Sequence, residues 1–170
     1  KGVLQMSNNN KTKNNTNEKT IEYTEEAYIQ DTLAHIELVQ RYISQFILIL
    51  EQRARNHDKS KLQEPEMSIL RKYTPYLDEL EYGSEAYQEH LNKVRVALDH
   101  HYKHNSHHPE HYENGIRGMD LLDLVEMYFD WRASAIKYGN TIQNSIKVGQ
   151  KRFDLSDDLV AIFENTARKF

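Results

Sequence analysis

The sequence contains no cysteine, which excludes disulfides, thiolate zinc sites, iron–sulfur clusters and a cysteine nucleophile. Only three prolines and six glycines occur in 170 residues, and no stretch of alternating β-branched residues is present. The longest apolar run, residues 46–50, is far shorter than the roughly 20 residues that span a bilayer. The net charge of −4 argues against a general electrostatic grip on nucleic acid. We therefore expect neither a membrane nor nucleic acid as a general partner.

Two regions of different composition follow one another along the chain. Residues 1–21 are rich in Asn, Lys and Thr and cannot bury enough apolar surface to fold, so we predict a disordered tail. From residue 22 onward, apolar residues recur with the period of an α-helix, which predicts a single all-α domain over residues 22–170. The predicted helices cover residues 24–55, 67–73, 76–82, 85–105, 119–138, 141–148 and 156–168, with a short one starting near residue 59.

Histidine is the most informative residue type, because six of the nine histidines lie between His100 and His111. The pair His57-Asp58, at a predicted helix boundary, is a further candidate for metal binding. Neighbouring side chains on a helix diverge by roughly 100°, but both can reach one metal ion where the backbone bends. His35 lies on the predicted first helix, on the face that we expect to be buried.

Three carboxylates share one face of the predicted helix 119–138. Asp123, Glu126 and Asp130 follow the spacing i, i+3 and i+7, with apolar residues on both sides. An acidic line beside apolar residues is costly unless a cation meets it, and that cation is either a metal ion or a basic side chain. Imidazole and carboxylate ligands together favour a transition metal over calcium.

Several motifs resemble a known superfamily. The order His35, His57-Asp58, Asp123 resembles the HD superfamily of metal-dependent phosphohydrolases, in which a His, a His-Asp pair and a distant Asp hold one metal. Residues 57–61, His-Asp-Lys-Ser-Lys, look like the HDxxK variant of that motif. More closely, roughly residues 29–163 resemble a small, uncharacterised phage and bacterial family with an HD-like domain. That closer resemblance lies in residues 101–105, 107–111, 123–127 and 130–131 (His-Tyr-Lys-His-Asn, His-His-Pro-Glu-His, Asp-Leu-Val-Glu-Met and Asp-Trp).

The resemblance implies an HD-like helical bundle that holds one or two divalent ions (Mn, Fe, Mg, Co or Zn). HD proteins with two extra histidines hold a second metal that the Asp of the pair bridges, which implies His101 or His104 with His108 or His107 here. The metal ligands that it implies are His35, His57, Asp58, His101, His104, His108 and Asp123.

The same resemblance implies a metal-dependent phosphohydrolase of nucleotides or related small phosphate esters, in the cytoplasm of a bacterium or a phage-infected host. Asp58 and Lys61 would be catalytic, and Lys61, Arg95 and Lys103 would contact the substrate phosphate. Two other functions stay open: an HD-type diiron oxygenase with the same ligands, and a non-catalytic module that binds a metal or ligand. A metal-free surface cluster of histidines is a third interpretation, and a homo-oligomer is compatible with the sequence.

Overall fold

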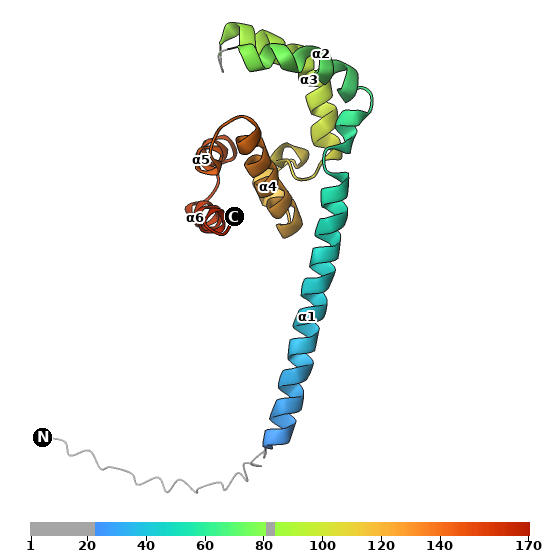
Figure 1. The fold of residues 1–170 in the computed structure, drawn as a ribbon, viewed down its shortest axis with the longest axis vertical. Coiled ribbons are helices and arrows are strands. Elements are labelled where there is room, and N and C mark those ends of the chain that lie inside the picture. Colours follow the sequence, from blue (N-terminus) through green and yellow to red (C-terminus); the bar gives the residue numbers. More distant parts are fainter. Residues whose placement is uncertain (1–22, 81–83) are drawn as a thin grey trace, which may run out of the picture. The chain divides into compact units, whose positions relative to one another are not determined.

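The structure, a computed structural model, describes residues 23–80 and 84–170, without the side chains of residues 77–79. The tail predicted over residues 1–21 lies outside this range. The described residues form α-helices and short 3-10 helices and contain no strand (Figure 1), which confirms the predicted all-α class. The elements are α1 (Glu25–Asn56), η1 (Lys59–Leu62), α2 (Glu66–Glu79), α3 (Glu85–His104), η2 (Pro109–His111), η3 (Gly115–Gly118), α4 (Leu121–Lys137), α5 (Ile142–Phe153) and α6 (Asp157–Ala167).

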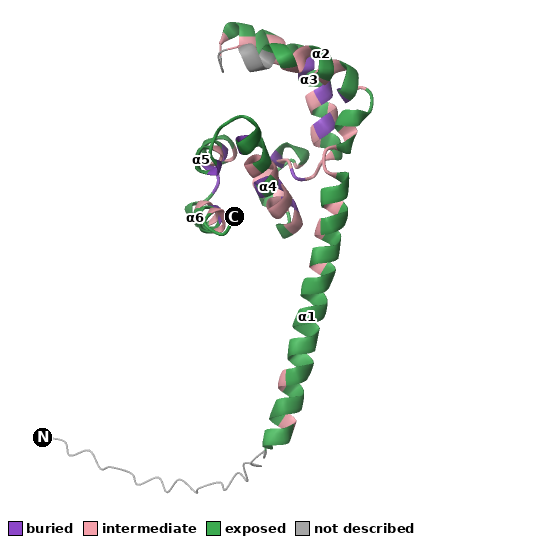
Figure 2. Cartoon of the chain, in the orientation of Figure 1, coloured by how far each residue is buried: buried purple, intermediate pink, exposed green. Residues whose placement is uncertain are grey.

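The chain divides into two compact units, residues 1–41 and 42–170. The described part of the first unit is the beginning of α1, and no residue of α1 is buried (Figure 2). The stretch Glu25–Leu62 is long and apolar enough to cross a membrane by length and composition alone, a test that core helices of soluble proteins also pass.

The hydrophobic core of the second unit lies among α4, α5 and α6. A glycine allows the close contact between α4 and α5, because a Cβ on Gly149 would lie 2.3 Å from the ring of Trp131. The side chains of Thr141 and Ser156 accept backbone N–H groups at the starts of α5 and α6, as polar caps do. The buried core residues are Met127, Tyr128, Ile142, Ile146, Leu155 and Phe163.

Helices α2 and α3 lie side by side in the second unit. We expected Pro75 to separate two short helices, and this is wrong, because α2 runs through Pro75 without a break. A proline removes one backbone donor from a helix. Packing against α3 stabilises α2 despite that missing hydrogen bond, since tertiary contacts supply most of the stability of short helices.

Arg53 connects the end of α1 to α4 within the second unit. Its Nη2 atom lies 2.6 Å from Asp123 Oδ1, and its Nε atom lies 2.6 Å from Glu126 Oε2. The Asp123 side chain is only 2% exposed, so its charge depends on these partners. One guanidinium therefore compensates two carboxylates of α4.

We expect Arg53→Met to lower the free energy of unfolding by about 3 kcal/mol, because it leaves the buried charge of Asp123 without its cation. Arg41→Met is the matched control, since the Arg41 side chain is 59% exposed and forms an exposed ion pair with Glu37 on the same helix. The control should change the free energy of unfolding by less than about 0.5 kcal/mol. Urea denaturation followed by circular dichroism measures both, and equal effects would contradict this role of Arg53.

Candidate metal centre

The centre begins with an unusual backbone conformation between α1 and η1. Asp58 has a φ of 56° and a ψ of 14°, in the left-handed region that few residues other than glycine adopt. This turn brings two neighbouring side chains together, and His57 Nε2 lies 3.6 Å from Asp58 Oδ2. Such strained conformations cluster at functional sites.

Two histidines face the first carboxylate oxygen of Asp58, and a third lies beside them. His101 Nε2, from α3, lies 3.2 Å from Asp58 Oδ1, and His107 Nε2, from the following loop, lies 3.6 Å from it. His108 Nε2 lies 2.9 Å from His101 Nε2. One ligand atom from each of these four residues lies within 4.8 Å of the others, so together they form a group that can hold a metal ion.

The second oxygen of Asp58 belongs to another such group. His57 Nε2 lies 3.6 Å from Asp58 Oδ2 and 3.6 Å from Asp130 Oδ1 on α4. The ligand atoms of His57, Asp58 and Asp130 again lie within 4.8 Å of one another. The Asp58 carboxylate thus faces two adjacent groups, one with each oxygen.

Two outer carboxylates orient three of these imidazoles. Glu66 Oε2, on a side chain with no exposed surface, lies 2.9 Å from His101 Nδ1. Glu126 Oε1 lies 2.8 Å from His57 Nδ1 and 3.3 Å from His107 Nδ1. An ionised carboxylate only accepts hydrogen bonds, so in each pair the Nδ1–H group donates. A neutral ring then carries its lone pair on Nε2, the atom that faces Asp58.

Lone pairs that face a carboxylate repel it unless a cation lies between them. Asp58 Oδ1 and His107 Nε2 are both buried and have no hydrogen-bond partner among the residues that the structure describes. Buried polar atoms without partners are rare and call for an explanation such as an ion. Three imidazole nitrogens and one carboxylate oxygen suit zinc, iron, cobalt or manganese, so the donor set fits a divalent transition metal.

The electrostatics of the cluster point the same way. Burial alone would raise the pKa of Asp58, but without a metal a hydrogen bond from His101 and the neighbouring Lys61 bring it well below its usual range. Burial lowers the pKa of His108 to about 3, with help from His107 and His101, so this ring is neutral. The facing carboxylates of Asp130 and Glu126 raise the pKa of His57 to about 10 without a metal. The site therefore attracts positive charge, either protons or a metal ion.

The structure brings together four of the seven predicted metal ligands: His57, Asp58, His101 and His108. His35 lies in the first unit and belongs to none of these groups. Its predicted position on a buried face is wrong, because α1 contains no buried residue. His104 is also exposed, and its Nδ1 atom lies 2.8 Å from the His100 carbonyl.

Asp123 lies outside the groups as well, because protein donors occupy both of its oxygens. Oδ1 accepts from Arg53 and Ser106, and Oδ2 accepts from the Tyr112 hydroxyl and the Asp120 backbone N–H. The structure has Asp130 where we expected Asp123. Glu66 was not among the predicted site residues, and His107 was predicted only as an alternative to His108.

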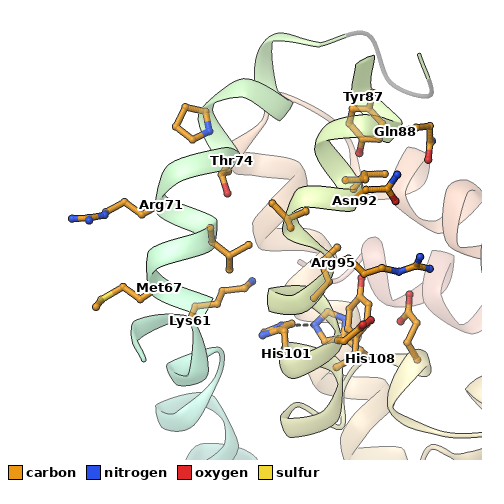
Figure 3. Close-up of a pocket in the computed structure, with 18 of the residues that line it drawn as sticks. Lys61, Met67, Arg71, Thr74, Tyr87, Gln88, Asn92, Arg95, His101 and His108 are labelled. Carbon is orange, nitrogen blue, oxygen red and sulfur yellow. Dashed lines mark hydrogen bonds between the residues drawn. The ribbon is translucent and has the colours of Figure 1, made fainter. Parts of the chain in front are cut away.

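A cavity of about 1100 Å³ opens from the histidine side of the centre (Figure 3). His101 and His108 line one part of it, and Lys61 and Arg95 from the predicted substrate contacts also line it. Lys103, the third predicted contact, is exposed and is not among the lining residues. The charged lining residues are Lys61, Arg71, Arg95, Lys137 and Arg152, against Asp99 and Glu110.

A second, apolar cleft of about 500 Å³ lies on the other side of the centre, between the end of α1 and α4. His57 and Asp130 line it together with apolar residues. The centre thus has a basic approach and an apolar approach. The apolar lining residues are Ile47, Leu50, Ala54, Val125, Phe129 and Ala133.

Comparison with known families places most of the chain in one of them. The model of DUF5662, a family of unknown function, matches residues 24–169. The chain belongs to this family. No curated protein matches the chain, and no solved structure does. Membership in DUF5662 assigns no reaction.

We expect Glu66→Gln to lower the affinity of the histidine group for Zn²⁺ by about 10- to 100-fold, the usual effect of losing a carboxylate behind a metal-bound histidine. Glu66 holds both His100 Nδ1, at 2.7 Å, and His101 Nδ1, whereas one amide oxygen replaces the two carboxylate oxygens poorly. Isothermal titration calorimetry measures the affinity. Glu64→Gln, an exposed substitution two residues earlier, is the control, and equal affinities in both variants would refute this role of Glu66.

Proposed function

We propose that this protein is a metal-dependent phosphohydrolase that acts on a nucleotide or a related small phosphate ester. The observation that carries the proposal is the Asp58 carboxylate, which faces two groups of metal-ligand atoms beside a basic cavity. The superfamily resemblance of the His57-Asp58 motif supplies the substrate class. The ligands under this proposal are His57, Asp58 and Asp130 in one group, with His101, His107 and His108 joining Asp58 in the other.

A bound divalent cation would polarise the phosphoryl group and lower the pKa of a water molecule. The protein's own side chains have separate tasks. Lys61 Nζ, 2.6 Å from Asp58 Oδ2, lies at the boundary between the centre and the cavity, where it can neutralise phosphate oxygens. Arg95 offers a guanidinium farther along the same cavity, and guanidinium groups bind phosphate in a bidentate manner.

The second candidate is an HD-type diiron oxygenase, and the apolar cleft beside His57 and Asp130 is the observation that favours it. An apolar wall suits the oxidation of a carbon substrate better than the binding of a phosphate. We favour hydrolysis because the larger cavity has five basic lining residues against two acidic ones. Lys61, which contacts Asp58 directly, belongs to that cavity.

Asp130→Asn should lower both Mn²⁺ affinity and phosphatase activity on the order of 100-fold or more, because a direct ligand matters more than the outer carboxylates. Asp123→Asn, seven residues earlier on the same helix, is the matched control. It should lower the free energy of unfolding, since Asp123 is buried in a hydrogen-bonded network, but leave activity within a few-fold. Hydrolysis of a panel of nucleotides and 4-nitrophenyl phosphate with Mn²⁺ or Co²⁺ provides the activity.

Asp58→Ala distinguishes the three functions when it is compared with the native protein. Hydrolysis that disappears in this variant supports a phosphohydrolase. Iron in anaerobically purified protein, with oxygen uptake and no hydrolysis, would establish the oxygenase instead. Ligand binding that is equal in both proteins, without any turnover, would leave a binding module and remove the enzymatic proposal.

A further inference from the structure

Helix α1 carries an apolar face with a seven-residue period. Ile29, Ile36, Ile43 and Leu50 lie seven residues apart, and a second row of apolar residues lies beside them. Three heptads with this spacing are typical of a helix that pairs with another helix. The α1 stripe, as we define it, consists of Ile29, Leu33, Ile36, Val39, Ile43, Phe46, Ile47 and Leu50.

Most side chains of the α1 stripe are exposed. Its side chains other than Phe46 and Leu50 are between 42% and 56% exposed. A contiguous apolar surface of this extent marks an interaction site. A lipid bilayer suits it poorly, because Glu37 and Arg41 lie in the middle of the helix and would enter the hydrocarbon region. A partner helix would cover the stripe and leave these charges in water.

The seven-residue row within the α1 stripe, Ile29, Ile36, Ile43 and Leu50, is symmetric about its centre. Ile29 and Leu50 are equally far from the midpoint between residues 39 and 40, and so are Ile36 and Ile43. In an antiparallel pair of identical helices, Ile29 of one copy therefore meets Leu50 of the other, and Ile36 meets Ile43. A seven-residue repeat of apolar residues forms such a seam in coiled coils.

The charges at the two ends of α1 favour the antiparallel orientation. The first turn is acidic, with Glu25 and Glu26, and the last turn is basic, with Arg53 and Arg55. An antiparallel pair places the acidic start of each helix beside the basic end of the other, whereas a parallel pair places like charges together. Arg53 already binds Asp123 and Glu126, so Arg55 is the cation for the other copy.

We propose that α1 pairs with α1 of a second copy as an antiparallel coiled coil through the α1 stripe. The apolar cleft supports this occupant, because Ile47 and Leu50 of the stripe continue there into Val125 and Phe129 of α4. The start of the other copy's helix would lie over this continuous apolar surface. The inference does not depend on the proposed hydrolase function.

One chain has a mass of 20.1 kDa. Sedimentation equilibrium of the full chain should give twice that mass. Ile36→Glu should raise the dissociation constant of the dimer at least tenfold, because the loss of one buried apolar side chain costs about that much or more. Leu38→Glu is the matched control, because Leu38 is 44% exposed, as Ile36 is at 45%, but lies on the opposite side of the helix. Circular dichroism confirms that both variants keep their helices. A monomeric native protein, or equal effects of the two substitutions, would overturn the proposal.

Disulfide cross-linking tests the orientation, since the native sequence has no cysteine. Ile29→Cys mixed with Leu50→Cys should form a cross-linked heterodimer, whereas Ile29→Cys alone should not form a homodimer. In the antiparallel pair two copies of residue 29 lie about 30 Å apart, by the rise of a helix over 21 residues. Efficient cross-linking of Ile29→Cys alone would overturn the antiparallel arrangement. Monomers that bind phosphatidylcholine vesicles through α1 would overturn the dimer in favour of a membrane.

Discussion

The site depends on the carboxylate of Asp58, toward which imidazole nitrogens from a turn, a helix and a loop are directed. Glu66 and Glu126 fix the Nδ1 atoms of their ring partners, so in neutral rings the Nε2 lone pairs of His101 and His107 face that carboxylate. Acceptors that face acceptors in a buried site are unstable without a positive charge between them. The surrounding fold is arranged to hold these groups in place: the left-handed conformation of Asp58 turns the chain, and Arg53 ties α1 to α4.

Much of the fold could be predicted from local sequence. The apolar period predicts α5 and α6, although α5 extends to Phe153 and not to residue 148, and the first helix begins and ends within one residue of its predicted bounds. The failure at Pro75 has a tertiary cause, since the contact of α2 with α3 overrides a local helix breaker. Local sequence also predicted a buried face for α1, but α1 has no buried residue. A periodic pattern shows that a helix has an apolar face, but it does not show which element covers that face.

The candidate site was predictable in composition but not in every member. Asp123 and Asp130 lie on nearly the same face of α4, because seven residues make almost two full turns. They are about 10 Å apart along the axis, and the positions of Arg53, Ser106 and Tyr112 decide which one is paired with protein groups. Glu66 follows a proline at the start of a helix, and nothing in its spacing reveals that it reaches His101 from another helix. His107 rather than His104 turns inward because the loop after α3 changes direction.

The central claim is that an inorganic cation lies between Asp58 and the histidines. Anomalous X-ray diffraction from crystals grown with Mn²⁺ or Co²⁺ tests it most directly, because it locates the metal and its ligands together. The account predicts an anomalous peak within about 2.3 Å of Asp58 Oδ1 and of Nε2 atoms of His101, His107 or His108, with any second peak beside His57 and Asp130. Ordered water or direct hydrogen bonds between these side chains, without an anomalous peak, would contradict it.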